Sequence, residues 1–174
     1  MTRMATGPRE VPAADCFDEL YEAALLPVYS YLFHRCGGVR EVAEDLTQEV
    51  FVAAARRLRD GHPVNATWCI VVARNKLVDH FRAAERDRRS LRLVHDRGAD
   101  RTEDVDVELS RDVVLAVLRS LPAAQQAAVV LRYFDDLSVQ EVAKRLGRSE
   151  RATEGLLRRG RDRFRVAYRE NVDG

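Results

Sequence analysis

Residues 138–165, SVQEVAKRLGRSERATEGLLRRGRDRFR, contain the clearest local signals in the chain. Ser138 and Glu141 have the spacing of a capping box, in which the hydroxyl accepts the third amide of a helix and the carboxylate reaches back. Gly147 can end this helix in the left-handed conformation, and Ser149 can cap another helix two residues later. Two capped helices joined by so short a turn predict a helix-turn-helix.

The second helix of this motif has two distinct faces. Leu157, Gly160, Phe164 and Ala167 recur at helical spacing and predict a buried stripe. Residues 148–169 hold eight arginines and three acidic residues, a net charge of +5. Alternating charges are typical of a solvated helix, but behind a helix-turn-helix signature they favour contact with DNA bases and phosphates. The residues placed on this outward face are Arg151, Glu154, Arg158 and Arg161, followed by Arg165.

Three helices are predicted upstream, where apolar residues recur at spacings of three and four and no segment alternates with period two. The first runs from Phe17, with a bend expected at Pro27 and an end at the glycine pair 37–38. The second covers about 39–58 and the third about 66–88. The fold is therefore predicted to be all-α.

The chain divides by charge and by periodicity. Residues 100–112 carry six acidic residues and two arginines, a net charge of −4, and lack helical periodicity. We therefore predict two small helical domains joined by an extended acidic linker. The predicted parts are a flexible tail (1–14), an N-terminal domain (15–89), a linker (90–110) and a C-terminal helix-turn-helix domain (111–170).

The composition narrows the class of protein. The 174 residues have a net charge of only +1, so any electrostatic function must come from local segregation of charge. Cys16, Cys36 and Cys69 are odd in number and form no CxxC pair, which favours a reduced, cytoplasmic setting over a disulfide framework. We expect no bound metal or other cofactor, no membrane insertion and no signal peptide.

Two further helix faces carry polar groups that a core does not need. In AEDLTQEVF (43–51), Asp45, Gln48 and Glu49 point away from the apolar stripe; they form either a solvated face or a docking surface for a basic partner. In the third helix the outward residues are Asn75, Asp79, Arg82 and Arg86. Asparagine can bond base edges and arginine can hold phosphates, although a plain solvated surface fits the pattern equally well.

Three segments in this order carry a family resemblance: AEDLTQEVF (43–51), TWCIVVARNKLVDHFR (67–82) and LPAAQQAAVVLRYFDDLSVQEVAKRLGRS (121–149). Together they resemble the extracytoplasmic-function group of bacterial sigma factors, over about residues 17–168. The resemblance implies a factor that brings core RNA polymerase to promoter DNA, and an anti-sigma protein that restrains it. The acidic linker would thread the polymerase channels that RNA uses.

The resemblance also implies roles for the three surfaces. Asp45, Gln48 and Glu49 would dock on the coiled-coil clamp of the largest polymerase subunit. Asn75 and Asp79 would read the −10 element and, with the loop 60–65, hold an extruded base, while Arg82 and Arg86 would contact the backbone. The helix-turn-helix would read the −35 element.

One position departs from the family pattern. Many members carry Ser-x-Gly-Thr-Val-Lys at the start of the last helix, whereas residues 149–154 here read SERATE. Glu154 replaces a lysine, so a phosphate or guanine contact is lost and an acceptor suited to cytosine N4 is gained. The −35 preference of this chain is therefore predicted to be its own.

Two other classes remain open from the residues alone. A conventional helix-turn-helix regulator would bind duplex operators without polymerase, but it leaves AEDLTQEVF without a role. An enzyme such as a nuclease is disfavoured, because no phosphate-binding loop and no pairing of nucleophile with base occurs, and the four histidines are scattered.

Overall fold

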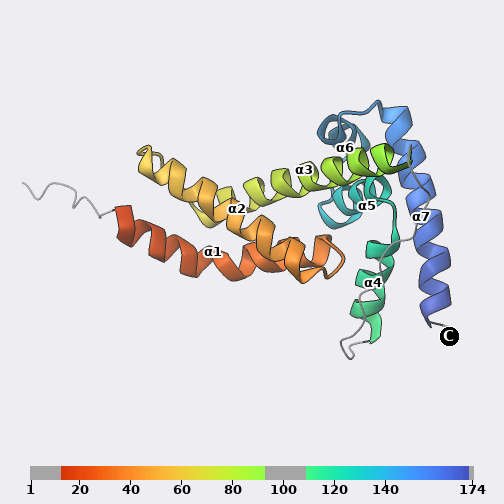
Figure 1. Cartoon of the computed structure of the whole chain (residues 1–174), viewed down its shortest axis with the longest axis horizontal. Helices are drawn as coiled ribbons and strands as arrows, with labels where there is room; N and C mark the ends of the chain where they lie inside the picture. Colours follow the sequence, from red (N-terminus) through yellow and green to blue (C-terminus); the bar gives the residue numbers. More distant parts are fainter. Residues whose placement is uncertain (1–12, 93–108, 173–174) are drawn as a thin grey trace, which may run out of the picture.

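A computed structural model describes residues 13–92 and 109–172, and within these two ranges every regular element is a helix (Figure 1). The predicted all-α fold is confirmed. The elements are α1 (Ala13–Arg35), α2 (Arg40–Arg59), α3 (Ala66–Arg92), α4 (Leu109–Ser120), α5 (Ala123–Val129), the π-helical turn η1 (Val130–Phe134), α6 (Val139–Leu146) and α7 (Glu150–Val172).

Helices α1, α2 and α3 pack against one another in the N-terminal half. Their apolar stripes meet in a core in which Leu32, Val50 and Leu77 are fully buried. Helix α1 runs without a break through Pro27, and the chain leaves it at Gly37 and Gly38, with φ angles of 73° and 78°. These left-handed conformations favour glycine, so the predicted end of the first helix is confirmed.

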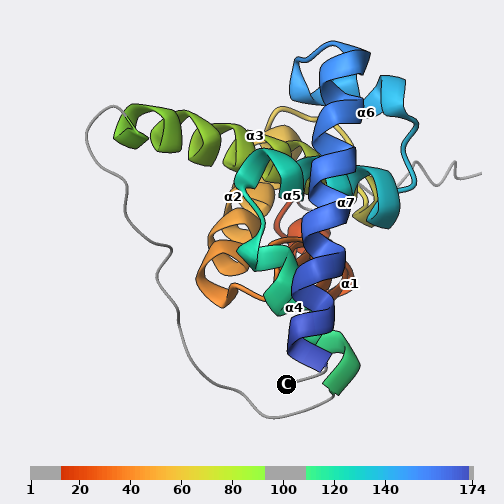
Figure 2. The same cartoon turned by 90° about the vertical axis from the view of Figure 1, so that its right-hand side faces the viewer.

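Helix α7 organises the C-terminal half. In Figure 2 it is the long helix that has α6 near its beginning and α4 near its end, and it also packs on α5. The approach to α5 is close at Gly160, where an added Cβ would lie 2.9 Å from Cγ2 of Val129. A side chain at position 160 would therefore push these helices apart.

The helix that begins as α5 ends in a wide turn. The Asp135 amide donates to the Val130 carbonyl at 3.2 Å, and the Leu137 amide donates to the Leu131 carbonyl at 3.1 Å. Asp136 then takes a φ of 54°, a left-handed conformation that aspartate tolerates better than most residues. This geometry ends the helix at Phe134 and turns the Asp135 side chain back towards the N-terminal half.

The predicted linker boundaries were too wide. Helix α3 continues to Arg92 rather than ending near 88, and α4 already begins at Leu109, inside the predicted linker of 90–110. Residues 83–92, AAERDRRSLR, hold no glycine or proline and are mostly good helix formers, so the helix persists after its apolar stripe has ended. Of the predicted tail and linker, residues 1–12 and 93–108 lie outside the described ranges.

The two halves share a core, which the sequence did not predict. Helix α3 extends beyond α1 and α2 to lie beside α5 and α6 (Figures 1 and 2). Val78 of α3 is buried with Leu131, Val142 and Leu157 of the C-terminal half. A second apolar cluster joins α1–α3 to residues of α4, α5 and η1, among them Leu118, Ala127 and Val130, and to Leu121 between α4 and α5. The described structure is therefore one packed body.

Two glycines in α7 give a matched test of this packing. Gly155→Ala should raise the free energy of unfolding by about 0.5–1 kcal/mol, because alanine favours a helix and the nearest atom to its Cβ, 3.3 Å away, is on the mobile Arg159 side chain. Gly160→Ala should instead lower it, because its Cβ meets Val129. Urea unfolding of both variants checks this; equal stabilisation by both would show that α5 and α7 are not closely packed.

Candidate nucleic-acid and protein-docking interfaces

The helix-turn-helix has the capping predicted for it. The Ser138 hydroxyl accepts the Glu141 amide at 3.2 Å, and the Glu141 carboxylate accepts the Ser138 amide at 2.8 Å. Hydrogen bonds from the Ser138 hydroxyl and amide lower the pKa of Glu141. Gly147 takes the left-handed conformation with a φ of 63°, and the Ser149 hydroxyl accepts the Ala152 amide at 3.2 Å at the start of α7. These bonds set how α7 leaves the turn.

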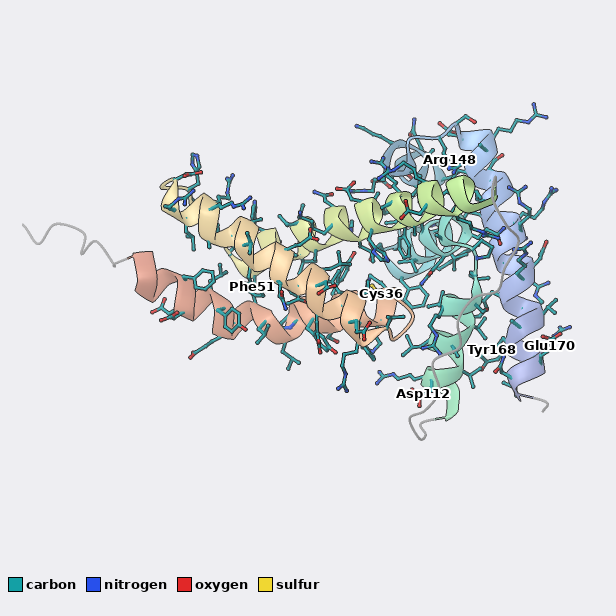
Figure 3. The ribbon with its side chains drawn as sticks, viewed as in Figure 1. Cys36, Phe51, Asp112, Arg148, Tyr168 and Glu170 are labelled. Atoms are coloured by element: carbon teal, nitrogen blue, oxygen red, sulfur yellow. The ribbon has the colours of Figure 1, made fainter. Side chains whose placement is uncertain are left out.

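Helix α7 separates a buried face from a charged one. Leu157 and Gly160 are buried as predicted, and Phe164 and Ala167 are partly buried. The predicted outward residues Arg151, Glu154, Arg158, Arg161 and Arg165 are all exposed. Figure 3 shows Arg148 at the start of this helix and Tyr168 and Glu170 towards its far end. The charged face is therefore open along the length that a DNA groove would need.

Sequence reasoning missed the first buried residue of α7. Thr153 is fully buried, and its hydroxyl donates to the Ser149 carbonyl at 3.0 Å. This bond satisfies the hydroxyl inside the helix, so a polar residue can occupy the inward stripe. The signal was available, because Thr153 lies four residues before Leu157.

The three residues singled out on α2 come together at one hollow of the surface. Asp45, Gln48 and Glu49 are exposed and line it, along with Val52, Ala53, Arg56 and Lys76. Glu49 forms an ion pair with Lys76 of α3 at 2.8 Å, and Val52 is 49% exposed. The hollow therefore combines two acidic and two basic side chains with an exposed apolar one, a composition suited to a protein partner.

The four residues singled out on α3 lie where that helix meets the C-terminal half. The side-chain oxygen of Asn75 accepts a hydrogen bond from the Arg145 guanidinium of α6 at 3.2 Å. The Arg82 guanidinium donates to the backbone carbonyl of Arg145. Asp79 lies 3.7 Å from Arg82. Arg82 and Arg86 also line a cavity of about 330 Å³ that includes Phe81, Glu85, Ala124, Ala127, Leu146, Gly147 and Arg148. Asn75, Asp79 and Arg86 are exposed, and Arg82 is partly buried.

The loop before α3 has a defined structural task. The side-chain oxygen of Asn65 accepts the Trp68 amide at 2.8 Å and so caps the start of α3. Trp68 is partly buried, and the Arg57 guanidinium lies 5.5 Å from its ring centroid. Gly61 has a φ of 79° and no atom within 4 Å of the position of a Cβ. The tip of this loop at Gly61 is therefore uncrowded, whereas its end at Asn65 is fixed by the hydrogen bond to α3.

A buried charged cluster at the seam between the halves was absent from the sequence predictions. The Asp135 side chain is fully buried and accepts hydrogen bonds from Tyr31 at 2.7 Å, Arg35 at 2.7 Å and Arg74 at 3.0 Å. Burial, together with the charge of Asp135, raises the pKa of Tyr31 to about 12, so its hydroxyl remains a donor at neutral pH. No sequence signal links residues that are 61 to 104 positions apart.

The described ranges give little support to a reactive cysteine or a metal site. Cys36 and Cys69 are free and buried, and burial raises the pKa of the Cys36 thiol to about 12, which makes it a poor nucleophile. No group of three or more metal-ligating side chains gathers anywhere in 13–92 or 109–172. Within the same ranges, no helix has the length and apolar character needed to cross a bilayer.

Comparison with known proteins places this geometry in a family. The chain matches the family model of Sigma-70 region 2 over residues 20–87 and that of Sigma-70 region 4 over residues 111–164. Region 2 thus covers most of α1–α3, and region 4 covers α4 to the middle of α7. The α2 hollow and the helix-turn-helix belong to different regions.

Several curated relatives carry the same description. The ECF RNA polymerase sigma factor SigF of Caulobacter vibrioides is 35% identical over 134 residues, covering 75% of this chain and 73% of the relative. BldN of Streptomyces coelicolor is 35% identical over 154 residues, with 82% of this chain and 56% of the relative covered. SigM of Bacillus subtilis is 26% identical, with 90% and 97% covered. The chain thus spans about half of BldN but nearly all of SigM.

The fold has a counterpart among solved structures. The sigma factor RpoE of Bartonella quintana, solved with the anti-sigma factor NepR, aligns over 90% of this chain and 96% of its own length, with a TM-score of 0.51 and 18% identity. At that identity the likeness concerns the fold alone. From the two matched regions and the SigF relative, this chain belongs to the ECF group of RNA polymerase sigma factors, which are transcription initiation factors.

Proposed function

We propose that this sigma factor binds core RNA polymerase through the α2 hollow and directs it to promoters whose −35 element is read by α7 and whose −10 element is read by α3. The observation that carries the proposal is the pairing, in one chain, of an open charged helix in a helix-turn-helix with a separate docking hollow. The factor acts in the cytoplasm alongside polymerase, has no catalytic activity of its own, and is restrained by an anti-sigma protein.

The −35 role is supported by the exposed face of α7. Arg151, Arg158 and Arg161 can neutralise phosphates or donate to guanine, whereas Glu154 can only accept when ionised. Because α7 buries its other face against α4, α5 and α6, the charged face is the one available to a DNA groove. Affinity would come mainly from the arginines and would fall with added salt. Glu154 would supply a base preference.

The docking role is supported by the α2 hollow. Asp45, Gln48 and Glu49 lie on one rim of the hollow. Helix α2, which carries most of the lining, lies apart from α7, so a partner could occupy the hollow while DNA is bound (Figure 1). A coiled-coil clamp with basic residues would pair with Asp45 and Glu49 and cover Val52. The −10 role rests on Asn75 and Asp79 for base contacts and on Arg82 and Arg86 for the backbone.

Charge reversal in the hollow tests polymerase docking. Asp45→Arg should weaken binding to core polymerase about tenfold or more, because it places a positive charge against a basic partner. Competition binding and promoter-directed transcription with purified core enzyme measure the effect. Glu44→Arg is the matched control, since Glu44 is exposed on the same helix but does not line the hollow.

Binding and transcription measurements also distinguish a sigma factor from a conventional helix-turn-helix regulator. If wild-type protein binds duplex operators tightly and core polymerase transcribes the same promoters without it, the sigma-factor mechanism is wrong. Equal loss of polymerase binding in Asp45→Arg and Glu44→Arg would contradict the α2 hollow as the docking site, but not the sigma-factor mechanism.

A promoter library tests base reading by Glu154. Glu154→Lys should change the preferred −35 sequence, from a cytosine towards a guanine at one position, because an acceptor is replaced by a donor. Arg158→Ala should weaken −35 binding by about 1–3 kcal/mol. Asp162→Lys, which makes the same charge change on an exposed part of α7 further along, should raise affinity without changing the preference. Identical preferences for Glu154→Lys and wild type would rule out base reading by Glu154.

A further inference from the structure

The cavity of about 330 Å³ between α3 and the turn of the helix-turn-helix, here called the α3 cavity, has the size of a small-molecule site. Such sites span about 300–1,000 Å³, so this one lies at the lower end of the range. Its lining comes from α3, α5, the end of α6 and the turn before α7, where Figure 3 labels Arg148. Several elements therefore enclose one small space.

Positive charge gathers around the α3 cavity. Arg82 and Arg86 line it from α3, Arg148 lines it from the turn before α7, and Glu85 is the one acid in its described lining. Three positive groups against one negative group give the lining a net charge of +2, although the whole chain carries only +1. Asp79, 3.7 Å from Arg82, is 70% exposed and outside the lining. Guanidinium groups converging from two elements suit a phosphate.

The fold holds two of these arginines in place. Arg82 donates to the Arg145 carbonyl, and its Nη2 lies 3.6 Å from the position that a Cβ of Gly147 would take. The Arg148 amide donates to the Ala143 carbonyl at 3.0 Å, which fixes the backbone of the turn. Both arginines are partly buried. A guanidinium carries five N–H donors, so a ligand can still be bound, and fixed donors lower the cost of binding it.

Another part of the lining is apolar. It consists of Phe81, Ala124, Ala127 and Leu146, of which Phe81 and Ala127 are buried. A nucleic-acid backbone offers mainly phosphate and sugar, so it would use the arginines but not the apolar residues. A small ligand with both a phosphate and a flat ring would use the whole lining.

We propose that the α3 cavity binds a nucleotide, with the phosphates held by Arg82, Arg86 and Arg148 and the base packed on the apolar lining. Glu85 adds an acceptor for N–H groups of a base or for ribose hydroxyls. This inference is independent of the sigma-factor mechanism. Where the proposed −10 role of α3 holds, a bound nucleotide would compete with the −10 strand for Arg82 and Arg86, and promoter recognition would respond to the nucleotide concentration.

Calorimetric titration of the full-length protein tests for the ligand. The probes are the four ribonucleoside diphosphates, with inorganic pyrophosphate and guanosine as partial ligands. At least one nucleotide should bind with one-to-one stoichiometry and about tenfold more tightly than either partial ligand, because both parts of the lining contribute. Absence of binding by all four nucleotides at millimolar concentration would overturn the proposal. Equal affinity for pyrophosphate and the nucleotides would also overturn it, since the arginines alone would then account for binding.

Two variants test the two parts of the lining. Arg148→Gln should weaken nucleotide binding about tenfold, because a charged hydrogen-bond donor is lost. Lys144→Gln is the matched control and should stay within about twofold of wild type, since Lys144 is exposed on the same motif but outside the lining. Ala124→Leu fills the apolar part without changing charge, so it should weaken nucleotide binding about tenfold and leave pyrophosphate binding unchanged. Circular dichroism establishes that each variant is folded; Ala124→Val replaces Ala124→Leu if the larger side chain disrupts packing.

The pattern of losses locates the ligand. Equal loss in Arg148→Gln and Lys144→Gln would indicate general attraction of an anion to basic residues and would overturn the site. Loss in Arg148→Gln with none in Ala124→Leu would indicate binding at the arginines only, as expected for a nucleic-acid backbone, and would overturn it too. Neither outcome bears on polymerase docking or promoter reading, which reconstituted transcription tests separately.

Discussion

The arrangement of the whole chain depends on one buried carboxylate. Asp135 has no exposed side-chain surface, and water therefore cannot replace Tyr31, Arg35 or Arg74 as its partners. Since those partners come from α1 and α3, the C-terminal half has its carboxylate satisfied only when it rests on the N-terminal half. Apolar contacts around Val78 and Leu118 add burial to the seam, but they are less demanding of exact position than a charge that must meet three donors.

Local signals made much of the fold predictable from sequence. Each cap of the helix-turn-helix involves only residues within four positions of one another, so its pattern is visible without a structure. These caps are the capping box at Ser138, the left-handed Gly147 and the cap at Ser149. The end of α3 was misjudged because the apolar stripe stopped at Phe81 while helix-forming residues continued. The seam was missed because complementary groups 61 to 104 residues apart leave no periodic trace.

The candidate surfaces were also predictable where local spacing decides them and unpredictable where distant residues meet. Helical spacing sufficed to place Asp45, Gln48 and Glu49 on one outward face, and the structure brings all three to one hollow. Spacing also placed Asn75 and Arg82 on one face of α3, but it could not reveal that both side chains form hydrogen bonds with Arg145. Their proposed roles came from a family resemblance, which does not give the contacts that each side chain makes within this chain.

The π-helical turn η1 makes the position of Asp135 a matter of chain length as well as side-chain chemistry. A π turn contains one residue more than the α-helical turn it replaces, and each residue advances an α-helix by about 100°. Loss of Arg132, Tyr133 or Phe134 would swing the Asp135 carboxylate away from Arg35 and Arg74 without removing the buried Val130 and Leu131. Insertions and deletions at this turn would therefore change how firmly the two halves of a related chain are joined, without changing the surfaces proposed to meet polymerase or DNA.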